Sequence, residues 1–191
     1  MRPVLVMLTS ALVVVVLLVA CNSAEQPRAE ETATATTSRD AGTPHFAVPE
    51  GWYALEHLLD VRAGDIPVAW ASNVTFKSAD LAEPKATGPS ETIRTLPSDG
   101  IVIVAVGPHA PAGSAPFPRL RFPLELSDGR YLVEQYKGQP APHVSFGYID
   151  TWVGDERVLN IHYYIGTNDP SAELLAEADR ALATFSLDWA D

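Results

Sequence analysis

Ile101-Val102-Ile103-Val104-Ala105-Val106 is a run of six apolar residues, and the first four are all β-branched. The run lies between Asp99-Gly100 and Gly107-Pro108. A run this short and this uniform predicts a β-strand that is covered on both faces. Such a strand lies at the centre of a sheet, so we expect the rest of the fold to be built outward from it.

On the N-terminal side of this run the pattern changes several times. Phe46 and Val48 predict a short strand that ends at Pro49. Near-helical spacing of apolar residues predicts a short helix or turn over residues 55–62. Residues 68–76 alternate with period 2, as a half-buried strand does. Residues 77–92, which are polar and contain prolines, are expected to form a loop.

Two hairpins are predicted on the C-terminal side. Residues 120–126 and 131–136 flank Asp128-Gly129, and Asp-Gly between apolar runs is typical of a hairpin turn. Residues 144–153 and 158–165 flank a second turn at residues 154–157. On its return arm the alternation places Ile161, Tyr163 and Ile165 on one face, and His162 and Tyr164 on the other.

A helix closes the chain. Asp169 is the expected N-cap and Pro170 the expected first helical residue. The helix carries apolar residues on one face, namely Leu175, Ala178, Leu182 and Phe185. Together these elements predict an α+β fold: a twisted, mostly antiparallel sheet of about six strands, with the C-terminal helix packed on one face.

Both ends of this domain resemble a known family. The opening Phe-x-Val-Pro-x-Gly-Trp, from Phe46 to Trp52, and the closing Ala-x-x-x-Leu-x-x-Phe-Ser, from Ala178 to Ser186, are similar to those of the small PsbP/Mog1-like α/β/α domains. Such domains occur in many exported bacterial lipoproteins. The resemblance implies a scaffold used mostly for binding or accessory roles, and a fold by itself does not give a function.

The first residues of the chain resemble an export signal. Leu18-Val19-Ala20-Cys21 follows an apolar run over residues 4–20 and resembles the lipobox of bacterial lipoproteins. The resemblance implies cleavage after residue 20, a lipid on the Cys21 thiol, and a position on the extracytoplasmic face of the cell membrane. A plain secretory signal or a single membrane span is the alternative. Cys21 is the only cysteine, so no disulfide can form within the chain.

Three regions are therefore expected: a signal peptide over residues 1–20, a flexible linker over 21–44, and one α+β domain over 45–191. The linker has no apolar residue larger than alanine, so it cannot bury enough surface to order itself. The chain has a formal net charge of −11. So acidic a surface repels nucleic acid, and membrane association should come from the lipid anchor.

Sequence motifs for catalysis and metal binding do not occur in the chain. Gly-x-Ser-x-Gly, Ser-x-x-Lys and the glycine-rich phosphate loops are missing, and the five histidines are scattered singly. We therefore expect no cofactor, no metal and no catalytic residue. A Ser/His/Asp constellation brought together only by folding remains an alternative.

Two features of the domain could bind a ligand. The proline-rich loop over residues 107–118 has the composition of a recognition loop or of a plain crossover. Tyr136, Tyr148 and Tyr164, with His162 beside Tyr164, would form an aromatic platform if they share an exposed sheet face. His162 could also meet Asp150 or Thr151 across the hairpin. The expected function is a lipid-anchored, non-enzymatic module that binds an envelope protein or an apolar ligand, with an envelope hydrolase as the alternative.

Overall fold

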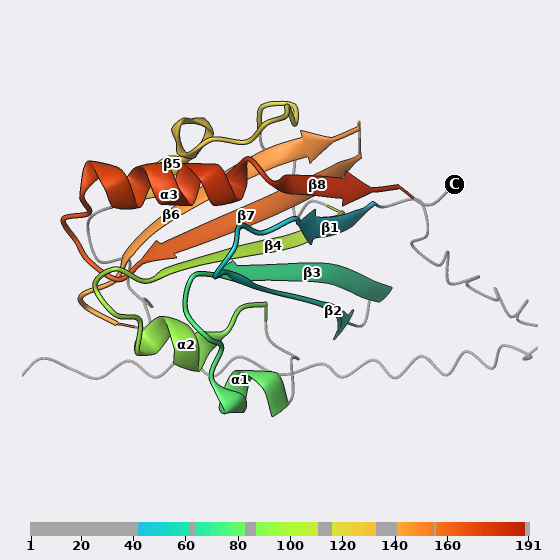
Figure 1. Ribbon diagram of the computed structural model, residues 1–191. Helices are drawn as coiled ribbons and strands as arrows, with labels where there is room; N and C mark the ends of the chain where they lie inside the picture. Colours follow the sequence, from blue (N-terminus) through green and yellow to red (C-terminus); the bar gives the residue numbers. More distant parts are fainter. Residues whose placement is uncertain are drawn as a thin grey trace, which may run out of the picture. The chain divides into compact units, whose positions relative to one another are not determined.

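The computed structural model describes residues 42–61, 64–82, 87–110, 116–132, 141–154 and 156–189 (Figure 1). These residues form two antiparallel sheets, three α-helices and one 3₁₀ turn. Cys21, the predicted signal peptide and most of the predicted linker lie outside the described residues. The first strand, β1 (Thr43–Phe46), begins slightly before the predicted start of the domain at residue 45.

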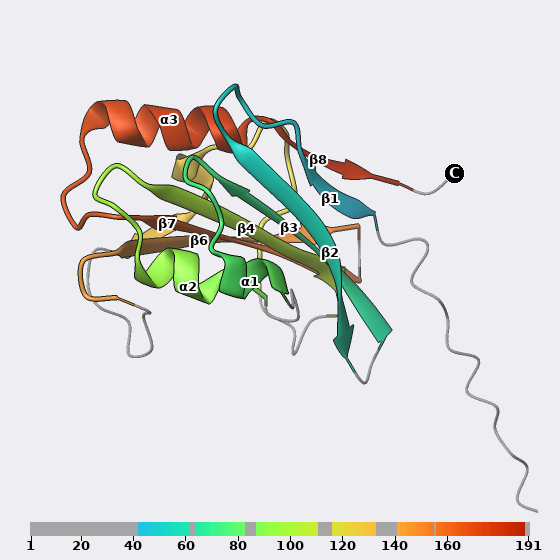
Figure 2. The same cartoon turned by 60° about the horizontal axis from the view of Figure 1, so that its bottom comes forward.

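The main sheet contains six strands in the order β2-β3-β4-β7-β6-β5, and each neighbouring pair is antiparallel. Together with the helix on one face, this confirms the predicted α+β fold with a twisted sheet of about six strands (Figures 1 and 2). The strands are β2 (Tyr53–Val61), β3 (Gly64–Ser72), β4 (Ile101–His109), β5 (Arg130–Leu132), β6 (Ser145–Val153) and β7 (Arg157–Ile165).

Strand β4 lies between β3 and β7 and is buried on both faces, as the apolar run predicts. Ile101, Ile103 and Ala105 point into one apolar cluster. Val102 and Val104 point into a second cluster on the other side. The sheet therefore has a core on each face, and β4 is the strand that both cores share.

The first core lies beneath α3 (Ala172–Leu182) and a small sheet of β1 paired with β8 (Phe185–Asp188). The helix begins later than expected: Ser171 is the N-cap, and its side chain accepts a hydrogen bond from Leu174 N at 3.2 Å. The N-cap at Asp169 was therefore a wrong prediction, because Ser171 offers a capping oxygen closer to the apolar turn. The helix also ends at Leu182, and Phe185 begins β8, where its ring meets that of Phe46 at 5.1 Å.

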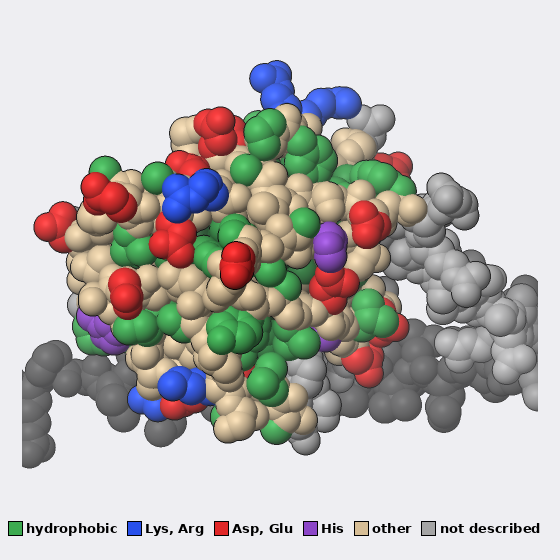
Figure 3. All heavy atoms as spheres, in the orientation of Figure 1, with side chains coloured by type: hydrophobic (Ala, Val, Ile, Leu, Met, Phe, Trp, Pro, Cys, Tyr) green, Lys and Arg blue, Asp and Glu red, His purple; other side chains and the backbone are tan. Residues whose placement is uncertain are grey.

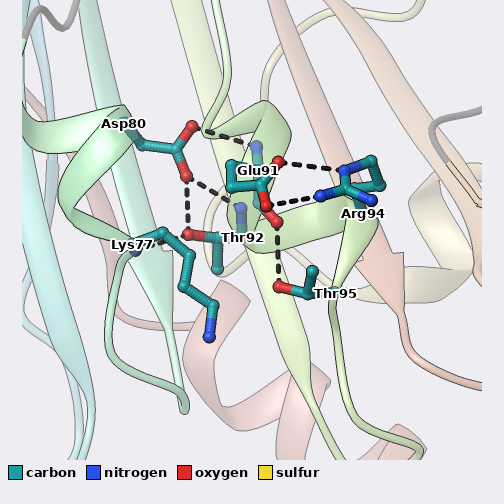
Figure 4. Close-up of polar contacts among 6 residues, drawn as sticks. All are labelled: Lys77, Asp80, Glu91, Thr92, Arg94 and Thr95. Carbon is teal, nitrogen blue, oxygen red and sulfur yellow. Dashed lines mark hydrogen bonds and ion pairs between the residues drawn. The ribbon is translucent and has the colours of Figure 1, made fainter.

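The second core lies on the opposite face of the sheet beneath α2 (Ser90–Arg94), which contributes Ile93, and the short helix α1 (Ser78–Ala82) lies beside α2 without a buried residue of its own (Figure 2). The expected loop over residues 77–92 is therefore wrong in part. Asp80 joins the two helices, because its carboxylate accepts hydrogen bonds from Glu91 N, Thr92 N and Thr92 Oγ1 at 2.7–3.0 Å (Figure 4). The partners of Asp80 are 11 and 12 residues further along the chain, so the local composition does not reveal this contact.

The helix or turn predicted over residues 55–62 is also wrong, since residues 55–61 belong to strand β2, which lies at the edge of the sheet. Leu55 and Leu59 pack against the second core, and the ring of His57 between them meets that of Trp70 at 4.7 Å. Leu58 is 61% exposed. Positions 55, 57 and 59 thus follow period 2, and the leucine spacing fitted a helix only because Leu55 and Leu59 also lie four residues apart.

The first predicted hairpin, over residues 120–136, does not form. Leu126–Asp128 makes a 3₁₀ turn, η1, and β5 after it pairs with β6 instead of with residues 120–126. The side chain of Asp128 accepts a hydrogen bond from Glu125 N at 2.9 Å and so closes the turn on itself. Residues 133–136 of the predicted return arm lie outside the described residues. The second predicted hairpin is confirmed as β6 and β7.

Candidate ligand-binding face

Four aromatic or imidazole side chains lie together on β6 and β7, on the sheet face that points away from α3. We call this set the aromatic face. Alternation along β6 and β7 places it there, because Ile149 and Ile161 between its members point into the core beneath α3. The register pairs Phe146 with Tyr164, and Tyr148 with His162. The aromatic face consists of Phe146, Tyr148, His162 and Tyr164.

Phe146 is at the centre of the set. Its ring centroid lies 5.2 Å from that of Tyr164, 5.5 Å from that of His162 and 6.0 Å from that of Tyr148. These separations are in the range at which aromatic rings attract each other. All four residues are partly buried and so keep some surface open. The aromatic face is therefore a preformed patch of rings and not a set of independent side chains.

The structure brings together three of the four residues that the sequence proposes for a platform. Tyr148, Tyr164 and His162 share the face, whereas Tyr136 lies outside the described residues. Phe146, which turns out to be central, was not proposed. Its position two residues before Tyr148 on the same strand was the signal that could have identified it.

The aromatic face has a polar end. Asp150 and Asn160 are the next register pair along β6 and β7, and Asn160 Nδ2 donates a hydrogen bond to Asp150 Oδ1 at 2.6 Å. The expected contact of His162 with Thr151 is wrong, because Thr151 is opposite Leu159 and points to the other face of the sheet. His162 is opposite Tyr148, and Asp150 acts on it only through its charge.

Burial keeps the ring groups of this face uncharged. It lowers the pKa of His162, and the negative charge of Asp150 opposes that change only in part. It raises the pKa of Tyr164 to about 12. At neutral pH the face therefore offers a neutral imidazole and a protonated phenol, which can donate or accept hydrogen bonds to an uncharged ligand.

His109 extends this surface at the end of β4. A register shift between Val106 and His109 places His109 opposite Val158, and burial lowers the pKa of its imidazole. Its Nδ1 atom is buried and has no hydrogen-bond partner among the described residues. Residues 111–115, in the middle of the predicted recognition loop, lie outside the described residues.

The described residues offer little for other chemistry. No group of three or more His, Cys, Asp or Glu side chains within them is arranged to hold a metal ion. The two buried serines, Ser72 and Ser145, donate their hydroxyls to the carbonyl oxygens of Ile101 and Ile165. No helix in the described part of the chain is long and apolar enough to cross a membrane.

Comparison with known proteins adds no relative: no protein-family model, no curated protein and no solved structure matches this chain.

Proposed function

We propose that the chain is a lipid-anchored lipoprotein of the extracytoplasmic face of the cell membrane, and that its domain is a non-enzymatic module that binds an apolar, ring-bearing ligand. The lipobox-like Leu18-Val19-Ala20-Cys21 supports the anchor. The resemblance of the two ends of the domain to PsbP/Mog1-like domains supports a binding or accessory role. We place the binding site on the aromatic face.

One observation carries the ligand class: the ring of Phe146 is within 6.0 Å of three other rings and all four residues remain partly open. A planar apolar ligand can extend this stack and gain further ring contacts. Because His162 and Tyr164 are neutral, an uncharged ligand can bind beside them without leaving a charge unpaired. The Asp150–Asn160 pair beyond the rings can bond a polar end of the ligand.

A hydrolase is less well supported. The hydroxyl of the buried Ser72 donates to the backbone carbonyl of Ile101 at 2.9 Å, so it is directed at the backbone and not at an imidazole that could take its proton.

Binding can be tested on a chain that begins at residue 22 and carries no lipid, because both apolar cores lie within residues 42–189. The probe is phenylnaphthylamine, an uncharged apolar fluorophore. We expect saturable fluorescence enhancement that a Tyr148→Ala variant weakens roughly two- to tenfold, the value of one ring contact. The control is Tyr53→Ala, which removes a 45% exposed tyrosine from β2. Equal binding by both variants would place the site elsewhere, and failure of the probe to bind at all would contradict the ligand class.

The anchor has its own test. Mass spectrometry of the mature protein should find a lipid-modified cysteine at its N-terminus, and a Cys21→Ala variant should lose stable membrane attachment. An intact N-terminus that begins at Met1 would contradict the proposed anchor without bearing on the aromatic face.

A further inference from the structure

A second surface feature lies on the opposite side of β6 from the aromatic face. A cavity of about 440 Å³ opens between β6 and the segment that leads from Pro118 to η1. We call it the arginine cavity. Its volume is in the range of small-molecule sites. The residues that line it and carry the argument are Arg119, Arg121, Leu124, Asp128, Ile149 and Thr151.

The cavity forms because two different segments cover the outer edge of β6. Strand β5 pairs with residues 146–148, while Arg119 forms a parallel bridge with Trp152. Hydrogen bonds hold this second segment, from Leu120 N to Trp152 O at 2.9 Å and from Trp152 N to Pro118 O at 2.8 Å. Between the two segments, Ile149 and Thr151 line the cavity from the α3 side of the sheet, although each residue is only 2% exposed.

The far wall of the cavity is anchored to the rest of the domain. Asp179 on α3 accepts a hydrogen bond from Leu126 N at 2.6 Å, which fixes η1 against the helix. Leu124 and Ile149 line the cavity and give its floor an apolar character, although each residue is only 2% exposed. The cavity is thus framed by hydrogen bonds and does not depend on a ligand for its shape.

Positive charge collects at this cavity in an otherwise acidic chain. The net charge is −11, yet two of the six lysines and arginines whose side chains are described line this one cavity. Arg119 and Arg121 are two residues apart on an extended segment, so both can face the same side. Figure 3 shows lysine or arginine side chains projecting at the upper edge, where residues 116–132 lie in Figure 1, and others over α3 and at the lower edge among acidic side chains.

The nearby carboxylates are already engaged by backbone amides. Asp128 accepts from Glu125 N and Asp179 from Leu126 N. Arg121 is exposed and has no hydrogen bond or ion pair with any other described residue. A guanidinium presents a fork of N–H donors that matches a carboxylate or a phosphate in a bidentate manner. Arg121 is therefore suited to bind an anion, with the positive charge of Arg119 beside it.

We infer that the arginine cavity binds a small amphiphilic anion, with a phosphate or carboxylate group at Arg119 and Arg121 and a short apolar group against Leu124 and Ile149. This site does not depend on the proposed function of the aromatic face, because Tyr148 and Thr151 point to opposite faces of β6. Arg121 would supply charge-assisted hydrogen bonds, Arg119 would add positive charge beside it, and the apolar floor of the cavity would select against a bare inorganic ion.

The inference is tested by calorimetric titration of the chain from residue 22 with octyl phosphate, octanoate, octanol and inorganic phosphate. We expect one of the two amphiphilic anions to bind at least tenfold more tightly than both octanol and inorganic phosphate. Whichever of the two binds better identifies the headgroup. Equal binding of octanol would overturn the role of the arginines, and equal binding of inorganic phosphate would overturn the role of the apolar floor.

Variants locate the site. Arg121→Gln and Arg119→Gln should each weaken binding of the preferred anion about tenfold. The matched control, Arg180→Gln, removes the same charge from an exposed position on α3 and should change binding less than twofold. All three side chains are exposed, so thermal unfolding should show intact folding. If Arg180→Gln weakens binding as much as the cavity variants do, attraction is non-specific and the site is disproved. Tyr148→Ala should leave anion binding unchanged even if the aromatic face binds nothing.

Discussion

The ring of Tyr163 on β7 lies directly against the backbone of Gly147, its register partner on β6. A Cβ atom added at Gly147 would overlap the Cζ and Oη atoms of that ring. Tyr163 is fully buried in the core beneath α3, so its ring has no open space into which to move. Gly147 is therefore required by packing, in the middle of a strand where glycine is otherwise unfavourable.

Gly147→Ala should lower the free energy of unfolding by about 1–3 kcal/mol, because the added methyl overpacks a filled core. The control is Gly88→Ala, where a new Cβ would make only ordinary contacts, the nearest with a Val104 methyl at 3.4 Å. Urea denaturation of both variants measures the difference. In the double variant with Tyr163→Leu the cost should be smaller than the sum of the two single costs, since the clash is gone. Additive costs would show that the Tyr163 ring is not the reason for the glycine.

Leu182→Ala tests the contact between α3 and the sheet. Leu182 is fully buried in the first core, and truncating it should cost about 2–5 kcal/mol of stability. The same change at Leu58, which is 61% exposed on β2, should stay within about 0.5 kcal/mol of the unchanged protein. Both values come from chemical denaturation monitored by circular dichroism. Similar losses at the two positions would contradict the packing of α3 on this face.

Asp80 is the residue on which the two short helices depend. Asp80→Ala leaves three donors on Glu91 and Thr92 without their acceptor, and should destabilise the domain by about 1–2 kcal/mol. Asp80→Asn keeps an acceptor oxygen and should cost less. The comparison variant Glu91→Ala removes only the exposed ion pair with Arg94, so its effect should be smaller than that of Asp80→Ala (Figure 4). If Glu91→Ala were the more damaging change, the clip formed by Asp80 would not be what joins α1 to α2.

These contacts explain which parts of the fold could be predicted from the sequence. The uniformly apolar run over residues 101–106 predicts a strand because both of its faces must be buried. The alternating pattern of β6 and β7 predicts a hairpin because one face of each strand must be buried. The apolar spacing of Leu175, Ala178 and Leu182 likewise predicts α3. Alternation also predicted that His162 and Tyr164 share a face. In each case the evidence lies within one element.

The failures share a different cause: the deciding partner is distant in sequence. Strand β8 forms because Phe185 meets Phe46, and η1 is held by Asp179 on α3. Asp128-Gly129 fits a hairpin turn, but Asp128 bonds its own turn and β5 pairs with β6. The arginine cavity was not predicted at all, since it depends on Arg119 reaching Trp152. Local patterns contain none of this information.

Stability should depend on pH through His162 and His109. Burial lowers the pKa of both imidazoles below the ordinary value of 6.5, and Asp150 opposes the change in each case. The unfolded chain therefore binds these protons more readily than the folded chain does. The contribution of the neutral imidazoles to stability is fully present above about pH 6.5 and is lost as the pH falls through their lower folded pKa. Unfolding free energies measured from pH 7 down to pH 5 should show this decline.

Replacing both imidazoles isolates their contribution to that decline. A His162→Gln, His109→Gln double variant carries no titrating group at these positions, so its stability should fall less steeply over the same pH range. Tyr164, which also faces Phe146, stays protonated throughout because its pKa is about 12. A double variant whose pH profile runs parallel to that of the unchanged protein would show that the buried imidazoles are not the cause.

Asp128 lines the arginine cavity, so its negative charge should oppose an anion bound there. Asp128→Asn removes that charge but keeps an oxygen that can accept from Glu125 N. Affinity for octyl phosphate or octanoate should therefore rise, by about threefold to tenfold for one partly screened charge. Added salt should reduce this gain in affinity.

Glu173→Gln serves as the matched control, because this exposed acid lies in the first turn of α3 and does not line the cavity. If Glu173→Gln raised affinity equally, net charge alone would account for the effect. A fall in affinity with Asp128→Asn would mean that the ligand group nearest Asp128 is a cation or a hydrogen-bond donor.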